Sequence, residues 1–357
     1  MTNLSTPARP VPRGGLRGRL FRWLEAMLFL TGGGLFAALL LKIGTAPILE
    51  ALVGLGPSLW LIVGIELVAI AANTLSWRCT IAPERRGDVP FGRLMAGRIV
   101  GDALNYVIPA GAGEISKVRL LSRAMPVGPA LASVALAKLT EGIALGLFGV
   151  LGLIVAWPIL VTDAASSVPI AVATFVGVGL AVGCLVAMRF GLFSTAVRIV
   201  HRLGMRCLDG SRLAGAAMSV DGEMSRFRRE RTGAVARSTI WHLIGWLVNV
   251  GELWLACHFL GLRPSLGVVF AGEALGVLCD AVFFFVPMRI GAAEGGRVLV
   301  FTLLGFSAAQ GLALGFVRRV RELAWTAIGL AIYPWLGMGP AHGDRTDRAS
   351  EATTVHA

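Results

Sequence analysis

The chain has 357 residues and a net charge of +12; 55% of its residues are hydrophobic and only 15% are charged. Soluble globular domains carry about 25% charged residues, so the composition excludes an ordinary soluble domain and predicts an integral membrane protein. The arginines gather before the first apolar run and between residues 189 and 237. In so apolar a chain this clustering indicates cytoplasmic loops under the positive-inside rule, and we expect no nucleic-acid partner.

Six segments have the ~20 apolar residues that a helix needs to cross a bilayer. In chain order they are 24–43, 57–77, 127–157, 168–188, 238–260 and 308–336. Two further segments, 91–108 and 266–286, contain charged residues and run into Pro-Gly breaks, so we expect both to be re-entrant. The predicted fold class is an all-α integral membrane protein with about six full transmembrane helices and two re-entrant, Pro-Gly-interrupted segments.

The domain organisation follows from where polar and basic segments interrupt the apolar ones. Residues 1–20 and 340–357 are polar, and we expect disordered tails there. A single transmembrane domain at 21–339 is predicted between them, with the basic amphipathic connector 189–236 at the cytoplasmic surface. The connector separates a first repeat at 57–188 from a second at 237–339. The basic segments place the N-terminus on the cytoplasmic side.

The two predicted repeats carry matching polar residues when they are aligned on Pro109 and Pro287. The matches are Asp102 with Asp280, Glu114 with Glu294, Lys117 with Arg297, Lys138 with Arg319 and Glu141 with Glu322. Such an internal repeat is common in transporter folds. With both segments re-entrant, the repeats are inverted and the C-terminus is also cytoplasmic. If 266–286 crosses fully, the inversion fails and the C-terminus lies outside; we favour the inversion.

The Pro-Gly breaks predict where the functional site lies. Backbone left unpaired at such a break must be buried in protein or line an aqueous cavity. The turn residues are Pro109, Gly111 and Gly113 in the first break, and Pro287 and Gly291 in the second. Entering from opposite sides, the two breaks are expected to meet near the midplane. The turn at 111–114 has the form of a phosphate cradle, but we favour a tight turn in which Glu114 caps the helix or carries a proton.

The charged residues divide into two expected roles. The segment 317–322 has three bases and one acid, which leaves positive charge uncompensated within the segment. Glu294, Glu273 or Asp280 is expected to match some of this charge and an anionic headgroup the rest, since arginine binds phosphate in a bidentate manner. The candidates for headgroup binding are Arg318, Arg319, Arg321, Lys138, Lys117 and Arg297. The candidates for charge balance or proton coupling are Glu114, Glu294, Glu141, Glu322, Asp102, Asp280 and Glu252. The alternative is that pairs three residues apart neutralise one another and fasten the repeats together.

Signatures of soluble-type catalysis and of metal binding are lacking in the sequence. The five cysteines are scattered without a CxxC pair, and they favour buried thiols over a metal site. We therefore expect no cofactor, no metal and no catalytic residue, although a membrane enzyme remains an alternative.

The chain resembles the flippase-like membrane family related to the transmembrane domain of lysylphosphatidylglycerol synthases. The resemblance rests on NYVIPAGAGEISKVRLL at 105–121, FVPMRIGAAEGG at 285–296 and VRRVREL at 317–323. The last two are most similar to the hopanoid-biosynthesis-associated branch. The chain departs from the family's usual Pro-Gly-Gly-x-Gly motif, because Met288 and Arg289 replace small residues. The resemblance, over roughly 20–336, implies a multi-pass bacterial inner-membrane protein that moves lipid between leaflets, and aminoacyl transfer is not expected.

The leading functional hypothesis is a lipid translocase that passes an anionic or amphiphilic lipid through a charged midplane cavity. Its expected partners are membrane lipids and enzymes of lipid or envelope biosynthesis. One alternative is a membrane enzyme or accessory subunit in lipid, hopanoid or envelope-glycan synthesis. Another is a scaffold in which every ion pair is structural.

Overall fold

The computed structural model describes residues 41, 55–108, 111–160, 167–190, 220–222, 224–227, 232–283 and 286–336. Within these ranges the regular structure is helical. The predicted first span at 24–43, apart from Leu41, lies outside the described residues. So do both predicted tails, Pro109 and most of the predicted connector 189–236.

The five other predicted spans all form helices. They are α3 (Ser58–Thr80), α6 (Val127–Leu160), α7 (Ser167–Phe190), α10 (Thr232–Phe259) and α13 (Ala308–Ile332), the last followed by the short η4 (Tyr333–Leu336). Three described stretches are long and apolar enough to cross a membrane by length and composition: Ser58–Thr80, Val127–Leu160 and Gly233–Phe259. Helix α13 has the length of a span, but four charged residues lie close together at its centre: Arg318, Arg319, Arg321 and Glu322.

The two predicted re-entrant segments each begin a helical hairpin. After a short turn, η1 (Pro83–Arg85), the first hairpin consists of α4 (Phe91–Val107) and α5 (Ala112–Leu121). The second consists of α11 (Leu266–Val282), the turn η3 (Pro287–Arg289) and α12 (Ala292–Leu303). A 17-residue helix is about 25 Å long, short of the ~30 Å hydrocarbon core. In each hairpin the second helix packs back on the first, as re-entry requires.

Positive φ angles let the chain reverse at both tips. Gly111 (φ 76°) and Gly291 (φ 75°) precede α5 and α12 directly. Met288 (φ 51°) and Arg289 (φ 50°) also lie in the left-handed region, which costs residues with a Cβ about 1–2 kcal/mol each. Met288 and Arg289 therefore adopt a backbone conformation typical of glycine, and they stand where the family's motif has small residues.

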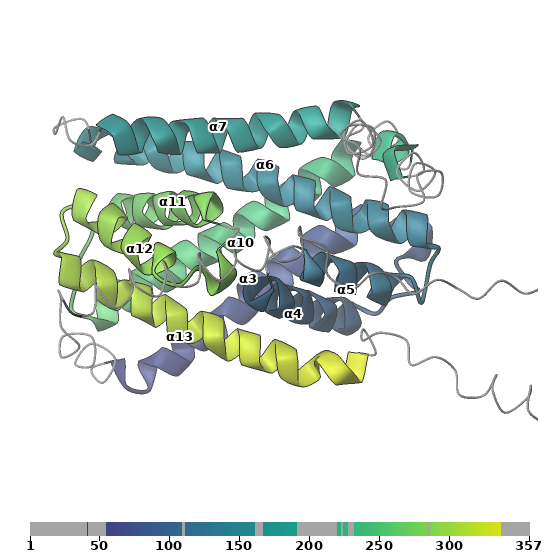
Figure 1. Cartoon of the computed structure of the whole chain (residues 1–357), viewed down its shortest axis with the longest axis horizontal. Helices are drawn as coiled ribbons and strands as arrows, with labels where there is room; N and C mark the ends of the chain where they lie inside the picture. The colour runs from purple at the N-terminus through teal and green to yellow at the C-terminus, as the bar shows by residue number, and fades with distance from the viewer. Residues whose placement is uncertain are drawn as a thin grey trace, which may run out of the picture.

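The two halves of the bundle have the same order of elements, and helices of each half pack against helices of the other. Figure 1 shows α4 and α5 in one half of the bundle and α11 and α12 in the other. Helix α4 packs against α13, α11 packs against α6, and α3 packs along α10. Each hairpin thus packs against the long helix of the other half as well as that of its own.

The side chains are distributed in the opposite sense to a soluble protein. Large apolar side chains are exposed on the outer helices, including Ile154 on α6 (64% exposed) and Phe175 on α7 (81%). Charged side chains are buried inside, including Lys117 (4% exposed), Glu273 (1%) and Arg297 (4%). Water disfavours both features, whereas a bilayer favours an apolar exterior and paired interior charges. The chain is therefore an all-α integral membrane protein.

Gly113 is expected to be essential for the first hairpin. A Cβ at this position would lie 1.8 Å from the backbone oxygen of Gly101 and 2.6 Å from Cγ of Asn105. Because a backbone atom cannot move aside cheaply, we expect Gly113→Ala to destabilise the protein by about 1–3 kcal/mol or more. Thermal unfolding in detergent measures this loss.

Gly251→Ala on α10 is the matched control, since a Cβ there meets nothing within 4 Å. We expect this variant to be as stable as the wild type or slightly more stable, because alanine has a higher helix propensity than glycine. Equal melting temperatures for the two variants would contradict the close packing of α4 and α5.

Candidate functional site

Cluster one is a network of six charged side chains at the first hairpin: Arg98, Asp102, Glu114, Lys117, Lys138 and Glu141. From α4, Arg98 contacts Asp102 at 2.7 Å and Glu141 on α6 at 3.1 Å. From α5, Lys117 contacts Asp102 at 3.1 Å and Glu114 at 3.4 Å. Lys138 on α6 lies 3.0 Å from Glu141 and 3.8 Å from Glu114. The network therefore ties both arms of the hairpin to the following long helix.

Cluster two occupies the equivalent place at the second hairpin and contains eight charged side chains. They are Glu273, Asp280, Arg289, Glu294, Arg297, Arg318, Arg319 and Glu322. Arg297 on α12 contacts Asp280 at 3.1 Å and Glu273 at 3.5 Å on α11. Arg318 on α13 contacts the same two carboxylates, at 3.7 Å and 2.6 Å. Cluster two is buried more deeply than cluster one, in which Lys138 is 56% and Asp102 is 44% exposed.

The two clusters are built on matching contacts. Lys117 with Asp102 and Arg297 with Asp280 are equivalent pairs, both at 3.1 Å. Lys138 links Glu114 and Glu141, and Arg319 links Glu294 and Glu322 in the same way. The matches found by alignment of the sequence thus correspond to matching ion pairs in space.

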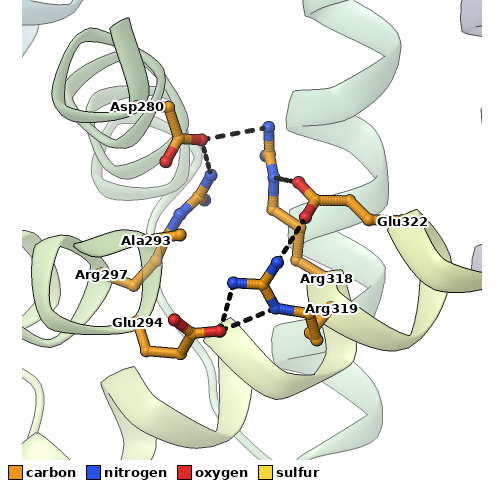
Figure 2. Close-up of a pocket in the computed structure, with 8 residues that line it drawn as sticks. Asp280, Ala293, Glu294, Arg297, Arg318, Arg319 and Glu322 are labelled. Carbon is orange, nitrogen blue, oxygen red and sulfur yellow. Dashed lines mark hydrogen bonds and ion pairs between the residues drawn. The ribbon is translucent and has the colours of Figure 1, made fainter. Parts of the chain in front are cut away.

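A small pocket opens among the side chains of cluster two. Figure 2 shows Asp280, Arg297, Arg318, Arg319, Glu294 and Glu322 converging on it from α11, α12 and α13. It has room for about one water molecule. A lipid headgroup does not fit in this pocket.

The tips of the two hairpins meet beside this pocket. Tyr106, in the last turn of α4, lies between two arginines of the second half: the guanidinium carbons of Arg289 and Arg319 are each 5.8 Å from its ring centroid. Arg319 also donates hydrogen bonds to the Tyr106 hydroxyl and, at 2.8 Å, to the carbonyl of Met288. Arg319 therefore contacts both tips from α13, and the predicted meeting of the two breaks is present in the fold.

Different side chains satisfy the free backbone donors at the two tips. In the first, Asn105 Oδ1 accepts from the Gly113 N–H at 2.9 Å while Asn105 Nδ2 donates to Glu114 at 3.0 Å. In the second, Glu294 Oε2 accepts from the Gly291 N–H at 2.8 Å. The capping role predicted for Glu114 is thus filled by Asn105 at the first tip, and by Glu294 at the second.

A third group, the Arg321 triad, joins α3, α10 and α13 away from the tips. It consists of Arg321, Glu66 and Glu252; Arg321 Nη1 lies 2.9 Å from Glu66 and also contacts the Glu252 carboxylate. Arg321 was predicted to bind a headgroup together with Arg318 and Arg319. Arg321 is instead bound by these two carboxylates, although it lies three residues from Arg318 and shares a face of α13 with it.

Glu273, Asp280 and Glu294 match positive charge of 317–322 as expected, and the part expected to await a headgroup is matched by acids of the protein as well. Arg318 is bound by Glu273 and Asp280, Arg319 by Glu294 and Glu322, and Arg321 by the acids of its triad. Glu322 lies on α13 itself, and the other acids come from four other helices, α3, α10, α11 and α12. The predicted intrahelical pairs Glu114–Lys117 and Lys138–Glu141 do form. Arg297 instead turns away from Glu294 toward α11, because α12 packs back on that helix.

Six contributors to the site were not among the candidates for headgroup binding, charge balance or the turns: Glu66, Arg98, Asn105, Tyr106, Glu273 and Arg289. Glu66 had a usable signal, since an ionisable residue inside an apolar span is a functional-site hypothesis by default. Arg98 lies four residues before Asp102, the spacing of a helical ion pair. Tyr106 and Arg289 carried no such signal, because their role depends on the contact between the two tips.

The fold and the site define a multi-helix membrane protein in which two broken hairpins meet inside the bundle, with buried ion pairs at their tips. The model of the lysylphosphatidylglycerol synthase TM region matches residues 24–329, and the chain belongs to this family. The match is to the family as a whole and does not single out the hopanoid-associated branch. No curated protein and no solved structure matches the chain. Family membership connects the protein with lipid-related processes at a membrane.

Proposed function

We propose that the protein is a lipid translocase of the bacterial inner membrane, in which a lipid headgroup crosses between the tips of the two hairpins. The observation that carries this proposal is the meeting of the tips at Tyr106, Arg289 and Arg319 beside a polar pocket. Backbone interrupted at membrane depth is tolerated only where it is buried in protein or lines a polar path. A purely structural bundle has no need of two such interruptions.

The ion pairs suit a site that opens and closes. In this structure the guanidinium groups of cluster two are occupied by the protein's own carboxylates. An anionic headgroup would replace Glu294 and Glu322 on Arg319, which can bind a phosphate with two parallel hydrogen bonds. The displaced carboxylates would then share the other bases of the cluster. We further propose cytoplasmic N- and C-termini, as the basic segments and the inverted repeat favour.

Leaflet exchange of fluorescent lipids in proteoliposomes tests the function. We expect the wild type to exchange one class among anionic, zwitterionic and polyprenyl-phosphate lipids, and Glu114→Gln to lose this exchange while remaining folded. Asp88→Asn is the matched control, because Asp88 is an exposed acid in the turn between α3 and α4. It should exchange lipid at the wild-type rate.

The same experiment separates the two alternatives. Chemical conversion of a lipid, detected by mass spectrometry without exchange between leaflets, would replace the translocase with a membrane enzyme of lipid, hopanoid or envelope synthesis. A structural scaffold would be indicated by two results together: the wild type exchanges no lipid, and Glu114→Gln is less thermally stable than the wild type.

A further inference from the structure

In one of the three buried groups of charged side chains, the numbers of acids and bases are unequal. Cluster one has three bases and three acids, and cluster two has four of each. The Arg321 triad has one base and two acids, Glu66 and Glu252. Within the part of the chain that the structure describes, the triad therefore carries one carboxylate in excess.

The excess carboxylate lies in an environment that penalises a net charge. The side chains of Arg321 and Glu252 are 5% and 7% exposed, and that of Glu66 is 20% exposed. The other charged groups acting on the two acids are Arg318 on α13, Glu273 on α11 and Asp102 on α4, and each already belongs to a balanced cluster. The charges of α6, Lys138 and Glu141, belong to cluster one. An ionised group without a counter-charge is costly in such an interior.

A second observation points to a hydrogen-bond donor at this place. Asn249 is three residues before Glu252, so the two side chains share a face of α10. The Asn249 Oδ1 atom is buried and has no hydrogen-bond partner in the structure. This acceptor, on the same face of α10 as Glu252, lacks a donor, which a protonated carboxyl or a water can supply.

These buried polar groups form a seam between α3 and α10. His242 Nδ1 lies 2.7 Å from Asn73 Oδ1, and the hydroxyls of Ser76 and Ser238 lie 2.7 Å apart. The α10 side of the seam runs from Ser238 through His242 and Asn249 to Glu252 at spacings of four, seven and three residues, which keeps it on one helix face. The triad is the charged end of this seam.

We propose that the Arg321 triad is a proton-binding site that holds one exchangeable proton, shared between Glu66 and Glu252. A proton removes the excess charge and leaves one carboxylate for the guanidinium. A metal cation fits less well, because the Arg321 guanidinium contacts both carboxylates and repels a second cation. The site exists whether or not lipid is moved; if the proposed function holds, a proton gradient can act here on three helices of the translocase.

Infrared difference spectroscopy of the purified full chain in nanodiscs tests the site without any lipid assay. We expect the wild type to show a protonated-carboxyl band that disappears on titration to alkaline pH. Glu252→Gln and Glu66→Gln should each lose this band, because one remaining acid is balanced by Arg321 and stays ionised. Glu141→Gln, which removes an acid from cluster one, should keep it. A wild type without the band, or a band that persists in both triad variants, would overturn the proposal.

Thermal unfolding gives an independent readout. The folded protein is expected to bind one proton more than the unfolded chain, so its stability falls as the pH rises, tenfold in the folding equilibrium per pH unit across that range. Glu252→Gln should lack this component. A melting temperature that rises with sodium concentration at constant pH, and is lost in Glu252→Gln, would show a metal cation in place of the proton. Absence of lipid exchange would contradict only the proposed function.

Discussion

Arg319→Ala is expected to destabilise the protein by about 3–5 kcal/mol, the cost of removing one member of a buried ion pair. Arg319 donates to Glu294 at 2.7 Å through Nε, contacts Glu322 at 3.5 Å and reaches both hairpin tips. Its loss leaves Glu294, which is 2% exposed, without its arginine. A lower melting temperature in detergent, together with loss of lipid exchange, is the expected result.

Lys138→Ala is the matched control for this variant, because Lys138 occupies the equivalent position in the first repeat. Its side chain is 56% exposed, and exposed ion pairs contribute about 0–1 kcal/mol. We expect a small loss of stability. Arg319→Lys separates folding from function, since it keeps the positive charge but lacks the planar fork that reaches several acceptors at once. If Arg319→Ala melts at the same temperature as Lys138→Ala, Arg319 does not link the tips.

Much of the fold could be predicted from the sequence, because hydrophobic length and Pro-Gly breaks are local signals. Helices α3, α6, α7 and α10 follow the predicted spans closely, and α4 and α11 cover the predicted re-entrant segments. The short return helices α5 and α12 were less visible, because each has only about three turns and mixed polarity. The hairpin form depends on their packing against α4 and α11.

The sequence also predicted most of the charged site residues, since ionisable groups in an apolar chain are costly and therefore informative. What could not be predicted was how they pair. Arg321 was grouped with its neighbours Arg318 and Arg319, but it pairs with Glu66 on α3 and Glu252 on α10. Pairing across helices 45 or more residues apart, as between Glu273 and Arg318, becomes visible only after the helices are packed.

The second large effect is expected when the two hairpin tips are joined covalently. Tyr106 and Arg289 face each other across the junction of the tips, and a headgroup that passes between the tips requires them to separate. In a variant without the native cysteines, Tyr106→Cys and Arg289→Cys can be joined by a short, reducible thiol cross-linker. We expect lipid exchange to fall to the rate of protein-free liposomes. Each single-cysteine variant, treated with the same reagent, controls for modification alone.

The measurement that tests the translocation path most directly is therefore leaflet exchange by this double-cysteine protein, before cross-linking, after it and after reduction. Passage between the tips predicts exchange that stops on cross-linking and returns on reduction, with no change in either single variant. Exchange that continues at an unchanged rate with the tips joined would contradict this path, because the lipid would then cross elsewhere in the bundle.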